Sequence, residues 1–147
     1  MGIGVVRLLE IFRDFKIYIR GSSNRGYYTA LYEVVRREDA RVVTVEDLRE
    51  YIRKLQERYP DRNFMLKKVK VKGKEYYVIT RKSYYIDSEG RKRIVYDRVP
   101  IYFDLINQKF YVPKSYLKIK PRLVKYIVMR VLGALGVARV KYVKLVS

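Results

Sequence analysis

The sequence predicts an α+β fold in a single domain over residues 1–147: helices near the N-terminus, a central and mostly antiparallel sheet, then an apolar helix and a closing strand. Apolar residues recur with helical spacing in the first third of the chain and with a period of two in the middle. Turn-forming pairs divide the middle into short strands, which favours hairpins and therefore antiparallel pairing. The chain has 147 residues, the size of one ordinary domain, and no linker or repeat divides it.

The N-terminal region is expected to hold two helices and one strand. Apolar residues at helical spacing predict an amphipathic helix over residues 4–14. Residues 15–20 alternate between apolar and polar side chains and predict a strand. The Gly- and Ser-rich residues 21–26 predict a flexible loop, and a second helix is expected over residues 27–37.

A third helix is predicted from its own start and stop signals. Thr44 fits the N-cap position, and Asp47 three residues later completes an acidic variant of the capping box. The helix is expected to stop before Pro60, because the residue before a proline disfavours helical backbone. Its apolar stripe comprises Leu48, Tyr51, Ile52, Leu55 and Tyr59.

Strands and turns are expected from Phe64 onward, where the apolar period changes to two. Val69 and Val71 alternate with lysines, and Gly73-Lys74 can turn the chain. The strands expected after it are 75–80, 93–96, 101–105 and 109–112, with turns at 87–90 and 107–108.

The C-terminal region is predicted to form a helix and a closing strand. Pro121 suits the first position of a helix that runs to about Leu135, and Gly136 is its stop. This helix is apolar almost all round, so we expect it to be buried centrally or at a subunit contact. The closing strand covers residues 137–146.

Composition excludes several classes of active site. The chain has neither histidine nor cysteine. Their absence excludes thiol nucleophiles, Ser-His-Asp triads, disulfides, zinc fingers, cysteine-ligated clusters and histidine-ligated metals. The glycines between Gly21 and Gly26 lack the Lys-Ser/Thr of a P-loop. We therefore expect a protein that is not an enzyme, with no cofactor, no metal site and no catalytic residues.

The charge points to a polyanionic partner. The chain carries 34 Lys and Arg against 15 Asp and Glu, a formal charge of +19, and has no acidic residue after Asp104. We expect a nucleic-acid-binding protein that coats or packages DNA, double-stranded DNA being favoured, through phosphate contacts with little sequence preference. The candidate contacts are Lys67, Lys68, Lys70, Lys72, Lys74, Arg81, Lys82, Arg91, Lys92, Arg93, Lys114, Lys118, Lys120, Arg122 and Lys125.

Tyrosines interleaved with these cations leave an alternative open. Exposed rings beside Lys and Arg can stack on unpaired bases, so the chain could instead bind single-stranded DNA or RNA. The candidate stacking residues are Tyr77, Tyr85, Tyr111 and Tyr116. Such rings also serve sheet packing or self-association, and we expect the protein to self-associate. A second alternative is a magnesium-dependent nuclease that uses Asp97 and Asp104.

The segment from Asp104 to the C-terminus resembles the core of RecB-like nucleases, especially the exonucleases associated with CRISPR loci. That family has a strand ending in Asp, a strand with Pro-x-Glu-x-Lys, a helix beginning Gln-x-x-x-Tyr and a final strand. Here Ile-Tyr-Phe-Asp104 precedes Tyr-Val-Pro-Lys-Ser-Tyr-Leu117, and Arg122-Leu-Val-Lys-Tyr126 opens the apolar helix. Ser115 and Leu117 occupy the Glu and Lys positions, and Arg122 replaces the Gln. The resemblance implies a nuclease scaffold that has lost its metal site and kept its DNA surface.

The composition is also similar to that of basic nucleocapsid proteins of filamentous viruses of hyperthermophilic archaea. Those proteins are small, free of cysteine and very basic. The N-terminus lacks a secretory signal, and the apolar residues 123–138 are too short and too charged to span a bilayer. We therefore expect no membrane association and a location inside the cell, in the cytoplasm or nucleoid, or in a virion.

Overall fold

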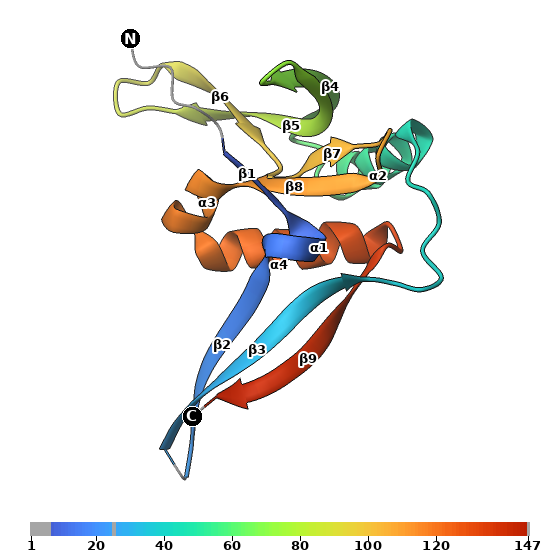
Figure 1. The fold of residues 1–147 in the computed structure, drawn as a ribbon. Helices are drawn as coiled ribbons and strands as arrows, with labels where there is room; N and C mark the ends of the chain where they lie inside the picture. Colours follow the sequence, from blue (N-terminus) through green and yellow to red (C-terminus); the bar gives the residue numbers. More distant parts are fainter. Residues whose placement is uncertain (1–6, 25, 147) are drawn as a thin grey trace.

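The computed structural model describes residues 7–24 and 26–146. In this part of the chain the fold is α+β, with two antiparallel sheets and four helices (Figure 1). The elements follow in the order β1 (Leu8–Glu10), α1 (Ile11–Asp14), β2 (Lys16–Ser23), β3 (Gly26–Arg36), α2 (Val45–Arg58), β4 (Asn63–Val71), β5 (Lys74–Ile86), β6 (Lys92–Arg98), β7 (Tyr102–Asp104), β8 (Lys109–Pro113), α3 (Lys114–Ile119), α4 (Pro121–Ala134) and β9 (Ala138–Val146).

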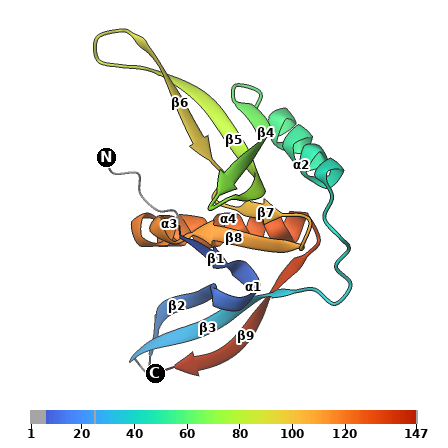
Figure 2. The same ribbon diagram turned by 45° about the horizontal axis from the view of Figure 1, so that its top comes forward.

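The two sheets extend in different directions from α4 (Figures 1 and 2). The larger sheet has the order β1-β8-β7-β5-β4, and β6 pairs with the part of β5 that extends past β7. The smaller sheet has the order β2-β3-β9. Figures 1 and 2 show α4 near the centre of the molecule, with the β4–β6 strands on one side and the smaller sheet extending away on the other.

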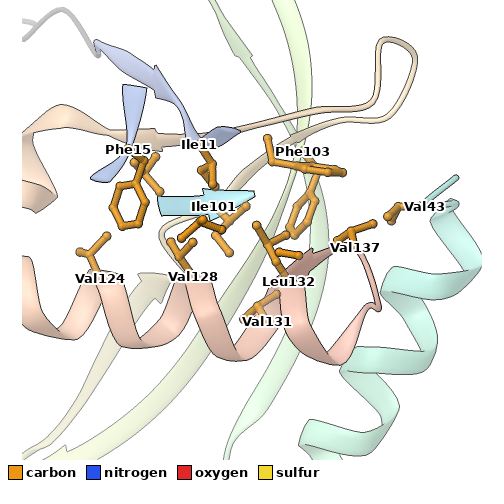
Figure 3. Close-up of a cluster of buried hydrophobic side chains, with 14 of the residues drawn as sticks. Ile11, Phe15, Val43, Ile101, Phe103, Val124, Val128, Val131, Leu132 and Val137 are labelled. Carbon is orange, nitrogen blue, oxygen red and sulfur yellow. The ribbon is translucent and has the colours of Figure 1, made fainter. Parts of the chain in front are cut away.

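One buried apolar cluster joins both sheets through α4. Val124, Val128, Val131 and Leu132 form the buried stripe of this helix, at the spacing of one helical face (Figure 3). They belong to the same cluster as Phe103 of the larger sheet and residues of the smaller one. The opposite side of α4 exposes Leu123, Tyr126 and Met129. The helix is therefore buried on one face only, although its sequence is apolar almost all round.

The expected N-terminal helices are the main error of the sequence analysis. Residues 4–6 lie outside the described part of the chain, and Leu8–Glu10 form a strand that pairs with β8, so only Ile11–Asp14 of the first helix is helical. The helix expected over residues 27–37 is wrong, because β3 occupies Gly26–Arg36 and pairs with both β2 and β9.

The helix over residues 27–37 is predicted by apolar side chains at helical spacing, namely Tyr28, Leu31, Tyr32 and Val35. Residues four apart, however, share a face in a helix and in a strand alike. In the structure, Ala30 and Val34 mark the buried face of the strand instead. The aromatic and β-branched residues of this segment favour a strand once partner strands are available on both sides. The expected loop at 21–26 is correspondingly shorter, since β2 runs to Ser23 and β3 begins at Gly26.

The elements with local start and stop signals are confirmed. Thr44 accepts a hydrogen bond from the Asp47 amide, and the Asp47 carboxylate accepts one from the Thr44 amide, so α2 has the expected capping box. The hairpin turn lies one residue before the expected Gly73-Lys74, because Lys74 already pairs with Val71. Lys72 and Gly73 have φ values of 52° and 81°, the left-handed pair that a two-residue turn requires. Gly136, with φ of 72°, follows α4 as expected. The short helix α3 was not predicted.

Candidate nucleic-acid interface

Apart from Lys74 at the start of β5, the candidate cations fall into three groups on different elements. The lysine edge comprises Lys67, Lys68 and Lys70 of β4 with Lys72 of the following turn. The helix cluster comprises Lys114, Lys118, Lys120, Arg122 and Lys125 on α3, α4 and the residue between them. The third group lies on or beside the ribbon arm, residues 83–95, which is the part of β5, β6 and their turn that extends beyond β4. Arg81 and Lys82 are at its base, and Arg91, Lys92 and Arg93 are near its tip.

The lysine edge lies on the outermost strand of the larger sheet, where β4 has β5 as its neighbour. All four lysines are exposed, and the Lys68 ammonium lies 5.5 Å from the centre of the Tyr77 ring. Among the described residues no ion pair joins any of the four to a carboxylate, although Glu75 is opposite Lys70 in the strand register. These charges are therefore available to an external anion.

Lys74 differs from its neighbours in the hairpin. Its ammonium lies 2.7 Å from Oδ2 of Asp104, and that carboxylate is 3% exposed. The hydrogen bond to Asp104 raises the pKa of Lys74, so the lysine stays charged but is already neutralised. Lys74 is thus placed to hold the sheet together rather than to contact a phosphate.

The helix cluster surrounds the start of α4. Lys118, Lys120 and Arg122 are exposed, and Pro121 occupies the first turn. No side chain caps this helix, so its first amides are open to an anionic group. Lys125 is different, because partial burial lowers its pKa and its ammonium lies 6.0 Å from the centre of the Tyr18 ring.

The charges of the ribbon arm are largely matched within the arm. Arg93 lies 2.8 Å from Asp87, and Arg91 lies 3.4 Å from Glu89. The hydrogen bond from Arg93 lowers the pKa of Asp87, and the amides of Arg91 and Glu89 lower it further. Lys92 stacks over the Tyr84 ring at 4.1 Å from its centre. Arg91 and Arg93 are therefore less available to phosphate than the lysine edge.

Three of the four candidate stacking tyrosines pack against the protein. Tyr77 and Tyr116 are half-buried against the main core, and Tyr111 stacks edge-on with Tyr76 in a second, smaller cluster. Tyr85 alone of the four is strongly exposed, at 53%. Tyr84 and several other tyrosine rings outside the candidate set are also exposed. The alternation of side chains along a strand does not reveal which face of the strand is left exposed to solvent.

A hollow between α2 and the end of α4 brings together cations that are far apart in the sequence. It has a volume of about 630 Å³, and the apolar residues that line it include Tyr51, Leu55 and Leu135. The carboxylates Asp47 and Glu50 at its rim already serve the α2 cap and Arg53. The cations that line it are Arg41, Lys54, Arg58 and Arg130. The sequence analysis missed them because no local pattern links residues 41 and 130.

Of the two acidic residues of the nuclease alternative, Asp104 is the one whose side chain the structure describes. Asp104 accepts hydrogen bonds from Lys74, from the Asn107 amide at 3.2 Å and from the Asn107 side chain at 3.0 Å. The side chain of Asp97 lies outside the described part of the structure. Among described residues no three of His, Cys, Asp or Glu lie together. Ser115 and Leu117, the positions that the RecB-like pattern assigns to a strand, lie on α3.

Comparison with protein-family models, with curated proteins and with solved structures finds no match for this chain. Within the described residues, no helix combines the length and the apolar character needed to cross a membrane. The function must therefore be argued from the charges and surfaces of the chain itself.

Proposed function

We propose that this protein binds nucleic acid without catalysis, coating duplex DNA through contacts between its cations and the phosphates. One observation carries the proposal. From Lys114 to the end of the described chain no cation forms an ion pair, because this region contains no acidic residue and no carboxylate from elsewhere reaches it. The lysine edge adds four more exposed cations without a carboxylate partner among the described residues.

The physical basis is the release of counterions from the phosphate backbone. Each phosphate neutralised by a Lys or Arg frees condensed cations, so affinity falls as salt rises. Such contacts carry no sequence information, which suits a protein that covers DNA of any sequence. Duplex DNA offers a higher charge density per length than a single strand, and we therefore favour it as the ligand.

The competing explanation is that the cations only keep the protein soluble and monomeric. Lysines on an outer strand do discourage edge-to-edge pairing of sheets. A heat-stable protein, however, is expected to balance surface cations with acids in ion-pair networks. This chain does so on α2, where Arg49 pairs with Glu46 and Arg53 with Glu50. The lysine edge and the helix cluster lack this balance, which supports a partner that supplies the negative charge.

The experiment compares two variants with the same change in net charge. In the first, Lys68, Lys70 and Lys72 are replaced by Gln. In the second, the paired Arg13, Arg49 and Arg53 are replaced by Gln as a matched control. Duplex DNA affinity is measured over a range of salt concentrations for both.

If the lysine edge contacts phosphates, the first variant should show a less steep plot of log affinity against log salt concentration. The slope falls in magnitude by about 0.9 per lost contact, or about 2.7 in total. The control keeps the wild-type slope, because its arginines are engaged with carboxylates. An equal effect of both variants would show that only net charge matters, and an unchanged slope for the first would remove the lysine edge from the interface.

Exposure of Tyr85 keeps single-stranded nucleic acid as the second candidate ligand. Base stacking on this ring predicts tighter binding to single strands than to duplex, and a selective loss on Tyr85→Leu. Competition between single-stranded and duplex oligonucleotides of equal length distinguishes the two ligands. A preference for duplex that Tyr85→Leu leaves unchanged supports the primary proposal.

A further inference from the structure

The ribbon arm is a two-stranded structure that no other element of the described chain covers. β4 pairs with β5 only as far as Lys82, whereas β5 and β6 remain paired out to Ile86 and Lys92. Figures 1 and 2 show the arm projecting from the body, away from the smaller sheet. An isolated pair of strands is only marginally stable in water, so an arm of this kind gains from contact with another surface.

The arm exposes large apolar side chains on both of its faces. Tyr84, Ile86 and Ile94 share one face, because Tyr84 is opposite Ile94 in the register, and they are 47%, 67% and 48% exposed. Tyr85 and Val95 lie on the other face, 53% and 37% exposed. Apolar side chains gathered on one exposed element are typical of a binding surface.

The charge of the arm suits a protein partner better than a phosphate. Residues 83–95 carry three cations and two carboxylates in a chain of formal charge +19. Asp87 and Glu89 pair with Arg93 and Arg91 at the tip, so the arm presents less free positive charge to a phosphate than the acid-free surfaces do. A second copy of this basic chain, in contrast, is less strongly repelled by the arm than by the acid-free surfaces.

A complementary surface lies on the outer side of α4. Leu123, Tyr126 and Met129 recur at three-residue spacing on the face opposite the buried stripe, and they are 48%, 59% and 39% exposed. We term these three residues the outer stripe. Arg122 and Arg130 flank it, and no carboxylate pairs with either among the described residues.

Charge decides how the two surfaces can combine. Two outer stripes facing each other would bring four arginines together with no acid from this segment to separate them. An arm against an outer stripe instead brings the carboxylate of Glu89, whose side chain is 65% exposed, towards Arg122 and Arg130. We infer that the ribbon arm of one copy docks on the outer stripe of a second copy, which is a contact beyond the nucleic-acid binding proposed above.

This contact joins two different surfaces, so it does not close on itself. Each bound copy still offers a free arm at one end and a free outer stripe at the other, and further copies can add. A row of copies joined in this way can extend along a linear polymer such as a nucleic acid. The contact leaves the lysine edge free but brings the arm close to Arg122 of the helix cluster. Because no phosphate takes part in it, the contact is expected without nucleic acid.

The test uses the full chain freed of nucleic acid, at an ionic strength high enough to release phosphate contacts. Sedimentation equilibrium of the wild type should show a mass that rises with concentration. An arm variant, Ile86→Ser with Ile94→Ser, and a stripe variant, Leu123→Gln with Met129→Gln, should each remain monomeric. Ile106→Ser is the control, because Ile106 is 95% exposed on a turn outside both surfaces. This variant should associate like the wild type.

Mixing the two variants distinguishes a contact between arm and outer stripe from a contact between two identical surfaces. The stripe variant keeps its arm and the arm variant keeps its stripe, so an equimolar mixture should form a two-chain complex and nothing larger. A mixture that stays monomeric overturns the assignment of these two surfaces to each other. So does association of either variant alone, or a wild type that is monomeric at every concentration.

Nucleic-acid binding of the same variants keeps this inference distinct from the proposed function. The arm variant should lose cooperative binding along DNA and keep the wild-type salt dependence per copy. If the arm variant instead loses affinity for DNA while the wild type is monomeric, the arm belongs to the nucleic-acid surface and the docking inference is wrong. The proposed function itself would survive that result.

Discussion

Replacing Asp104 with Asn tests whether this carboxylate is structural. Asp104 is 3% exposed and accepts from the Lys74 ammonium at 2.7 Å and from two Asn107 donors at 3.2 and 3.0 Å. The substitution keeps the size and one oxygen acceptor, but it removes the charge and turns an amide group towards Lys74. A hydrogen bond to a charged group contributes about 1.5–3 kcal/mol. Because Lys74 is 42% exposed and can regain water, we expect a loss of about 2 kcal/mol.

The pH dependence of this loss of unfolding free energy tests the role of Asp104 more directly than its size at a single pH. Burial raises the pKa of Asp104, but the hydrogen bonds from Lys74 and Asn107 outweigh it, so the pKa is below its ordinary value. A lowered folded-state pKa stabilises the fold above the unfolded pKa of about 3.9, and the stabilisation is lost as pH falls through the folded value. Urea unfolding of both proteins should therefore show a difference at neutral pH that shrinks in acid below the ordinary carboxyl pKa.

Two results would refute this structural role. The first is a difference in unfolding free energy that is the same at neutral pH and in strong acid. The second is a variant as stable as the wild type that has lost a magnesium- or manganese-dependent cleavage of DNA. The second result would favour the nuclease alternative, in which Asp104 is a metal ligand.

Two further predictions follow from named contacts. Gln108 accepts from the Val43 amide at 2.8 Å and donates to the Val43 carbonyl at 2.9 Å, so Gln108→Ala should cost about 2–4 kcal/mol in urea unfolding. Gln108→Glu keeps the acceptor but turns a carboxylate oxygen towards the Val43 and Leu105 carbonyls, so it should cost at least as much; a clearly smaller cost would contradict this pairing. Lys118→Glu with Arg122→Glu should leave the melting temperature nearly unchanged, because both side chains are exposed, and should lose DNA binding in a filter or anisotropy assay. A variant that melts early yet binds normally would make this helix end structural.

Local chemistry in the sequence was enough to predict α2, the hairpin turns and the limits of α4. Thr44 and Asp47 cap each other within one turn, and Pro121 and Gly136 act on the backbone at their own positions. The charge imbalance was equally visible, because the absence of acids after Asp104 is a property of composition. These features depend on residues a few positions apart, so no tertiary information is needed to find them.

The strand β3 and the availability of each cation were decided only by tertiary structure. Ala30 and Val34 fit a helix and a strand equally, and pairing with β9, more than a hundred residues later, selects the strand. The lysines of one hairpin look alike in sequence, yet Lys74 is neutralised by the distant Asp104 while Lys70 is not. Strand partners, buried faces and ion pairs between distant segments depend on which residues the fold brings together, and a sequence pattern with a range of a few residues does not contain that information.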